Sequence, residues 1–135
     1  MGAWGMGSFE NDGALGLLAD VVHGDNLIPV KESFEAVLAN EDYIEVDEAQ
    51  EAVAAGEVLA LLLKRPGANL PERLTTWATA HPLRVDDALH AQAVTAVEKV
   101  YAASEMRELW EETPDFGAWE TAVQDLLTRL KTVSG

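Results

Sequence analysis

Apolar residues recur every three or four positions along most of the chain, the spacing of a helix that buries one face. In the first such segment Leu15, Leu18 and Val22 share a face, and Gly24 is a natural terminator. The spacing predicts helices from Ser8–Asp12 to Gly24, Leu27–Asn40, Asp47–Lys64, Leu70–Ala80, from Asp86 or Asp87 to about Val100, and Asp115–Leu130. We therefore predict an all-α fold, a compact bundle of about six helices forming a single domain, 1–135.

Three positions refine this pattern. Asp47 is expected to be the N-cap of the third helix, because acids follow it in the first turn. Gly56 lies inside that helix at a cost of about 1 kcal/mol relative to alanine, which indicates a close crossing by another helix. Ser104 either bends the fifth helix or caps a new one, and the spacing leaves both interpretations open.

The first fourteen residues contain a glycine-rich segment that precedes the helical pattern. Gly2, Gly5 and Gly7 alternate there with bulky apolar residues, one of them Trp4. Glycine lets backbones approach closely, and burying a tryptophan stabilises a fold considerably. We expect this glycine-rich loop to pack on the helical body with Trp4 as its anchor, so that Trp4→Ala costs about 3–5 kcal/mol. The glycines lack the preceding strand and the lysine of a phosphate loop.

The same opening carries a resemblance to a bacterial family. It reads Met-Gly-Ala-Trp-Gly-x-Gly-x-Phe-x-Asn-Asp-x-Ala over residues 1–14, and a later run, Ser104-Glu-Met-Arg-Glu-Leu-Trp-Glu-Glu112, resembles the second motif of that family. The family is the uncharacterised domain of unknown function DUF4259, and the resemblance extends to about Leu130. The chain departs from the family pattern at Gly16-Leu17, where Asp-Trp is common. Because the family has no established activity, the resemblance implies membership of a family but implies no function or mechanism.

Charge and composition narrow the classes of function. The formal net charge of −15 argues against nucleic acid and anionic lipid as partners, since both require a basic face. It favours solubility and attraction to basic proteins. The absence of cysteine excludes disulfides and thiolate metal sites and suits a reducing compartment. With no signal-peptide pattern and no apolar run of membrane-spanning length, a cytoplasmic location is expected.

Acids are concentrated between Glu32 and Leu63, where nine of them occur without a single base. This segment lacks the alternating Asp pattern and central glycine of a calcium loop, so we predict no metal site. Two interpretations remain: a solvated helix surface, or an electrostatic docking surface over Glu32–Glu57 for a basic protein. In the docking interpretation the residues expected to contact the partner are Glu41, Asp42, Glu45 and Glu48.

A second candidate site joins the opening loop to the Ser104–Glu112 motif. Trp110 lies among glutamates, an arrangement that suits a cationic ligand, although a large aromatic residue more often fills the core. The residues expected to line such a pocket are Trp4, Asn11, Asp12 and Trp110. No activated nucleophile, general base or oxyanion motif accompanies them, so we predict no catalytic residue and no cofactor.

The sequence thus leaves the function unknown, with three interpretations from different classes. The favoured one is a non-catalytic acidic protein-binding module, an inhibitor or an immunity-like protein of the bacterial cytosol. The second is a small-ligand enzyme or sensor whose pocket lies between the opening loop and the Ser104–Glu112 motif. The third is a structural homo-oligomer whose exposed helix faces pair.

Overall fold

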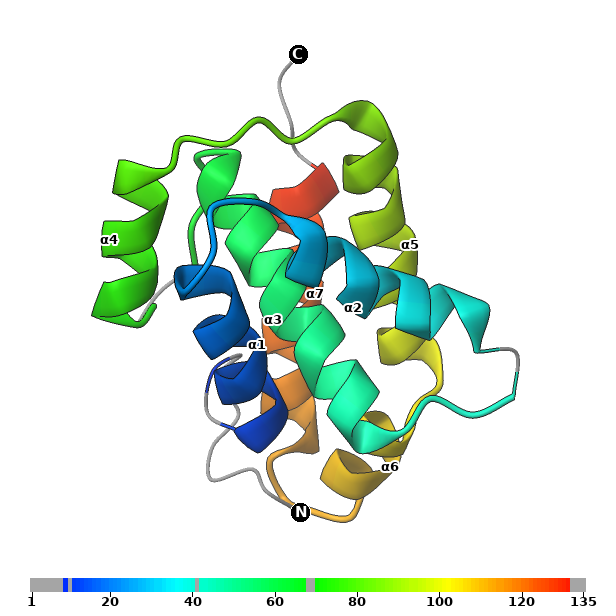
Figure 1. The fold of residues 1–135 in the computed structure, drawn as a ribbon. Helices are drawn as coiled ribbons and strands as arrows, with labels where there is room; N and C mark the ends of the chain where they lie inside the picture. Colours follow the sequence, from blue (N-terminus) through cyan, green and yellow to red (C-terminus); the bar gives the residue numbers. More distant parts are fainter. Residues whose placement is uncertain (1–8, 10, 41, 68–69, 132–135) are drawn as a thin grey trace.

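The computed structural model describes residues 9, 11–40, 42–67 and 70–131, and within them the chain forms seven helices (Figure 1). They are α1 (Asp12–Val22), α2 (Ile28–Ala39), α3 (Val46–Leu62), α4 (Glu72–Ala80), α5 (Asp87–Ala102), α6 (Glu105–Glu111) and α7 (Phe116–Lys131). The predicted all-α bundle is confirmed. Of the first fourteen residues, 1–8 and 10, with Trp4 among them, lie outside the described residues, whereas Phe9 and Asn11 are buried and Asp12–Ala14 belong to α1.

Helix α3 runs through the middle of the bundle and contacts each of the other six described helices (Figure 1). Every residue from 52 to 60 is buried, and most of them are alanine or glycine. A helix that is buried all round needs small residues where its neighbours approach. A Cβ atom added at Gly56 would lie 3.2 Å from side-chain atoms of both Val97 in α5 and Leu126 in α7. The predicted close crossing at Gly56 is therefore confirmed.

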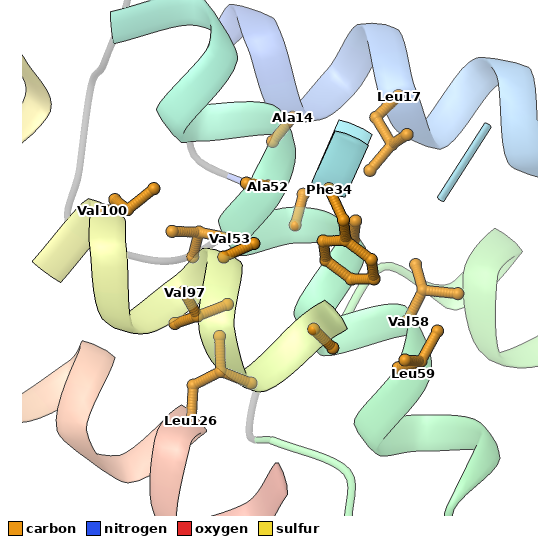
Figure 2. Packing of buried hydrophobic residues seen from close by; sticks show 14 of the residues in the cluster. Ala14, Leu17, Phe34, Ala52, Val53, Val58, Leu59, Val97, Val100 and Leu126 are labelled. Atoms are coloured by element: carbon orange, nitrogen blue, oxygen red, sulfur yellow. The ribbon is translucent and has the colours of Figure 1, made fainter. Parts of the chain in front are cut away.

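The core gathers side chains from all seven helices (Figure 2). Phe34 of α2 is fully buried and lies beside Val58 of α3 in the close-up view. Burying a side chain of this size stabilises the fold by about 1.5–3 kcal/mol. In the first helix the predicted face is only partly right, because Leu18 is buried with Ala14, Leu17 and Val21, whereas Leu15 and Val22 are half-buried at the edge of the core.

Short polar contacts fix where several helices begin. The side chain of Asn11 accepts a hydrogen bond from the Ala14 backbone N–H at 2.7 Å, and so caps α1. Ser104 accepts from the Arg107 N–H at 3.1 Å and donates to the Val100 carbonyl oxygen at 2.8 Å. Ser104 therefore ends α5 and caps a separate helix, which raises the predicted number of about six to seven.

The predicted cap of α3 is wrong by two residues. The N-cap is Glu45, and Asp47 is already inside the helix. The Glu45 N–H donates to Glu48 Oε1 at 3.4 Å, one half of a capping box. The Val46 N–H donates to Glu105 Oε1 of α6 at 2.8 Å. Because this contact spans almost sixty positions, no local pattern of residues could indicate it.

Candidate functional site

The connection between α2 and α3 is held against the start of α6. The Glu105 N–H donates to the Ile44 carbonyl oxygen at 2.9 Å, in addition to the bond from Val46 to the Glu105 side chain. The Tyr43 hydroxyl donates to Glu108 Oε1 at 2.8 Å. These three bonds give the connection a defined shape, and they bring the acids of the connection next to those of the second motif.

Asn40 at the end of α2 shapes the same connection. Its side-chain oxygen accepts from the N–H groups of Asp42 and Tyr43 at 3.1 and 3.0 Å. The nearby Lys99 donates its ammonium protons to the carbonyl oxygens of Val37 and Asn40 at the C-terminus of α2. A cation at a helix C-terminus interacts favourably with the helix dipole. Lys99 therefore stabilises the C-terminus of α2 by binding its last carbonyl groups.

Tyr43 is the centre of this acidic connection. Tyr43 is 45% exposed, one of two large hydrophobic residues that are exposed in the described part of the chain. The hydrogen bond to Glu108 raises the pKa of Tyr43 to about 12, with smaller contributions from desolvation and from the charges of Glu108, Glu105 and Glu45. The phenol therefore remains neutral, and its hydroxyl stays directed at Glu108 while part of the ring faces solvent.

Three more carboxylates face a hollow between α1, α2 and α3. Asp20, Glu32 and Glu51 come from the three helices in turn, and the hollow has a volume of about 550 Å³. Desolvation raises the pKa of Glu51, and the charges of Asp47, Asp20 and Glu48 raise it further. We call this feature the carboxylate hollow. Of its like charges, those of Asp20 and Glu51 repel each other.

Glu48 links the hollow to the connection, because it acts on Glu51 and also accepts the Glu45 N–H. The result is one acidic surface. In the described part of the chain, none of its carboxylates forms an ion pair with Lys or Arg. The acidic surface comprises Asp20, Glu32, Asp42, Glu45, Asp47, Glu48, Glu51, Glu105 and Glu108.

Three of the four residues predicted to contact a partner lie on this surface. Asp42 and Glu45 are exposed, Glu48 is half-buried, and Glu41 lies outside the described residues. Glu57 was wrongly included in the predicted segment. It is 5% exposed and forms a two-pronged ion pair with Arg129 of α7, with N···O distances of 2.7 and 3.1 Å. Glu57 is buried because its neighbours in α3 are buried apolar residues and because Arg129, 72 positions further along the chain, pairs with it.

The residues predicted to line a ligand pocket have different surroundings. Asn11 is buried and occupied as the cap of α1, and Asp12 is exposed at the first position of that helix. Trp110 is buried in the core cluster. Trp4 lies outside the described residues. Four surface hollows formed by the described residues are all lined by other side chains.

The structure also adds residues that the sequence interpretation missed. Asp20, Glu105 and Glu108 belong to the acidic surface although they lie far from the segment where acids are concentrated. The sequence did contain a signal for two of these residues, because Glu105 and Glu108 belong to the Ser104–Glu112 motif. Among the described residues, no three His, Asp or Glu side chains are grouped so that they could hold a metal ion.

The fold and this surface define an all-α protein with an extended, uncompensated group of carboxylates. The family model for the domain of unknown function DUF4259 matches residues 2–122, and the chain belongs to this family, as the opening motif predicted. No curated protein and no solved structure matches the chain. None of the helices in the described part is both long and apolar enough to cross a bilayer.

Proposed function

We propose that this protein is a non-catalytic binding module of the bacterial cytosol, an inhibitor or an immunity-like protein, whose acidic surface docks on a basic protein. The observation that carries the proposal is the exposed ring of Tyr43, fixed by Glu108 among carboxylates that have no basic counterpart in the described chain. Tyrosine is enriched at protein interfaces, where it contributes much contact area at little entropic cost.

The ring of Tyr43 and the carboxylate hollow can each bind a basic side chain of a partner, arginine or lysine. The half-exposed ring of Tyr43 offers a face on which an arginine guanidinium can stack. The carboxylate hollow, about 550 Å³ in volume, accommodates the end of a lysine or arginine side chain between Asp20, Glu32 and Glu51. Charge complementarity of this kind accelerates association and rejects acidic competitors.

Helix dipoles account for only some of these acids. Asp47 and Glu105 lie in the first turns of α3 and α6, where a negative charge is stabilising. Asp20 lies in the last turn of α1, where a negative charge is unfavourable. Glu51 also has a raised pKa, so its ionised form is destabilised by the fold. Carboxylates retained at the expense of stability support a role in binding.

The first experiment identifies the partner through Tyr43. Tyr43 is replaced by a photo-cross-linking benzoyl-phenylalanine in the source cell, and Ala118, exposed on α7, is replaced in the same way as the matched control. We expect a basic protein to be cross-linked from position 43 and not from position 118. Equal labelling from both positions, or cross-linking of this chain only to itself, contradicts the proposal.

The second experiment measures association kinetics with the purified partner. The triple variant Glu32→Gln, Asp42→Asn, Glu45→Gln removes three exposed charges of the acidic surface. We expect its association rate to fall on the order of tenfold with little change in dissociation rate, since steering acts mainly on association.

The matched control removes the same charge elsewhere, by Asp25→Asn, Glu72→Gln and Asp87→Asn, three exposed acids outside the acidic surface. It should bind almost as the unmodified protein does. An equal loss in both triple variants would mean that net charge alone acts, and no loss in either would remove the acidic surface from binding.

A further inference from the structure

A second pocket is lined by residues from the beginnings of α2 and α5 and from the connection that follows α4. It has a volume of about 410 Å³, within the range of about 300–1,000 Å³ typical of small-molecule sites. None of the nine members of the acidic surface lines it. We call it the basic pocket, for the two cations on its wall, Lys31 and Arg84.

These cations are unusual in a chain with 24 acids and nine bases. In the described part of the chain, the structure gives neither Lys31 nor Arg84 an ion pair with a carboxylate. The pocket has one acid of its own, Asp86. Its Oδ1 accepts the Leu89 N–H at 2.7 Å and so caps α5. The two cations therefore outnumber the single, already engaged carboxylate.

The rest of the wall is largely apolar. Ile28 is 59% exposed, the more exposed of the two large apolar side chains that face solvent in the described chain. Leu83 and Leu89 line the pocket with it, and Gln92 adds an amide. An apolar wall with a few polar groups is the usual composition of a small-ligand site.

The backbone adds to the positive character of the pocket. Helix α2 begins at Ile28 with no acidic residue in its first turn. The Ile28 N–H already donates to Asn26 Oδ1 at 3.0 Å and Pro29 has no N–H, so this end contributes through the helix dipole and not through these two positions. The N-terminus of a helix carries a partial positive charge that attracts anions. The cavity, the two cations and this helix end all favour the same sign of ligand charge.

From this combination we propose that the basic pocket binds a small organic monoanion, a carboxylate attached to a compact apolar body. The carboxylate lies between Lys31 and Arg84. The Lys31 ammonium attracts it as a compact charge, and the planar Arg84 guanidinium can donate two parallel hydrogen bonds to it. The apolar body lies on Ile28 and Leu89. Asp86 and the net charge of −15 disfavour dianions such as phosphate esters.

Octanoate is a suitable probe, with acetate and octan-1-ol as controls that keep only the anion or only the apolar chain. Each is titrated into the isotope-labelled full chain while backbone amide shifts are recorded by NMR. We expect octanoate to shift amides around residues 26–31 and 83–92 in a saturable way. Acetate and octan-1-ol should bind at least about tenfold more weakly, because each lacks one of the two interactions.

Variants then locate the interaction. Lys31→Gln with Arg84→Gln should weaken octanoate binding by about tenfold or more, the effect of losing charged hydrogen bonds. Arg65→Gln with Arg73→Gln changes the net charge equally at exposed positions outside the pocket, and should leave octanoate binding almost unchanged. Ile28→Ser should weaken octanoate and leave acetate as it was.

Three results would overturn the proposal: shifts spread over the whole surface, equal losses in the two double variants, or acetate binding as tightly as octanoate. The outcome is independent of the acidic surface, because no residue is shared between the two sites. Failure here leaves the proposed docking function standing, and failure of docking leaves the basic pocket standing.

Discussion

At the scale of single residues, the pair of Glu57 and Arg129 joins α3 to α7 in a largely water-excluded position. Both prongs of the guanidinium reach the carboxylate, and the side chains are only 7% and 16% exposed. Burial alone would lower the pKa of Arg129, but the hydrogen bonds and charges of Glu57 and, to a smaller extent, of Asp125 together outweigh it and raise the pKa. A Cβ at Gly67 would lie 2.9 Å from Glu57 Oε1, so the adjoining backbone also fits this pair closely.

Replacing one member of this pair is expected to be costly. Arg129→Leu leaves the Glu57 carboxylate buried without its fork, and we expect the free energy of unfolding in urea to fall by about 3–5 kcal/mol. The double variant Glu57→Leu, Arg129→Leu removes both charges and should recover most of that loss. If the double variant is as unstable as the single one, the charge imbalance is not the cause.

Glu51 is expected to behave in the opposite way. Its pKa is raised in the fold, first by desolvation and then by neighbouring acids, so the folded state holds the proton more tightly than the unfolded state. The stability that protonation provides is present in acid and is lost as the pH rises through the folded-state pKa. Glu51→Gln should therefore raise the melting temperature at pH 7, with a gain that shrinks toward about pH 4.

The control for this change is Glu35→Gln, which removes one exposed charge from α2. This control measures how much the melting temperature rises simply because one negative charge is removed from a strongly acidic chain. Thermal unfolding of the three proteins across this pH range measures the difference. A gain at Glu51 that is no larger than the gain at Glu35, or one that is the same at both ends of the range, contradicts the assignment.

At the scale of helices, two interior glycines are expected to respond differently to substitution. Gly16 of α1 has nothing within 4 Å of an added Cβ, so Gly16→Ala should stabilise the protein by about 0.5–1 kcal/mol through helix propensity. Gly56 of α3 is pressed by α5 and α7, so Gly56→Leu should cost about 1–3 kcal/mol by overpacking. Denaturant unfolding measures both, and equal effects of the two substitutions would mean that α3 is less tightly crossed than the structure indicates.

The helices are also where sequence prediction succeeded. Local spacing located them because a helix that buries one face must repeat its apolar residues along that face. The close crossing at Gly56 could be predicted from residue chemistry within a few positions, whereas at Ser104 the same kind of local information left a bend and a cap equally open. The contacts of the acidic surface are different, because Tyr43 meets Glu108 across 65 positions and Glu57 meets Arg129 across 72. No local pattern specifies which of many exposed glutamates a distant residue will contact.

At the scale of the whole molecule, helix direction and charge are correlated. Helices α1, α3, α6 and α7 begin toward one end of the bundle, and α3 and α7 end toward the other (Figure 1). Acids lie in the first turns of α1, α3 and α6, whereas Arg129 and Lys131 lie in the last turn of α7. Each group is favourably placed with respect to its own helix dipole. The acids nevertheless stay close to one another, and their mutual repulsion is not relieved by the distant bases.

This balance predicts that moderate salt stabilises the protein. Salt weakens attraction and repulsion alike between exposed charges more than about 8–10 Å apart. Exposed ion pairs such as Lys131 with Glu98 are worth at most about 1 kcal/mol, so screening them removes little. The best-buried pair, Arg129 with Glu57, is screened least. Repulsion within a chain of net charge −15 is stronger than these attractions, and its relief should dominate.

We therefore expect the melting temperature to rise between about 20 and 150 mM sodium chloride, over which the Debye length falls toward about 8 Å. The triple variant Glu32→Gln, Asp42→Asn, Glu45→Gln provides the internal comparison, because it removes three carboxylates from the acidic surface. Its melting temperature should start higher at low salt and rise less. A melting temperature that is constant or falls with salt in the unmodified protein would mean that ion pairs outweigh repulsion. An equal rise in both proteins would place the dominant repulsion outside the acidic surface.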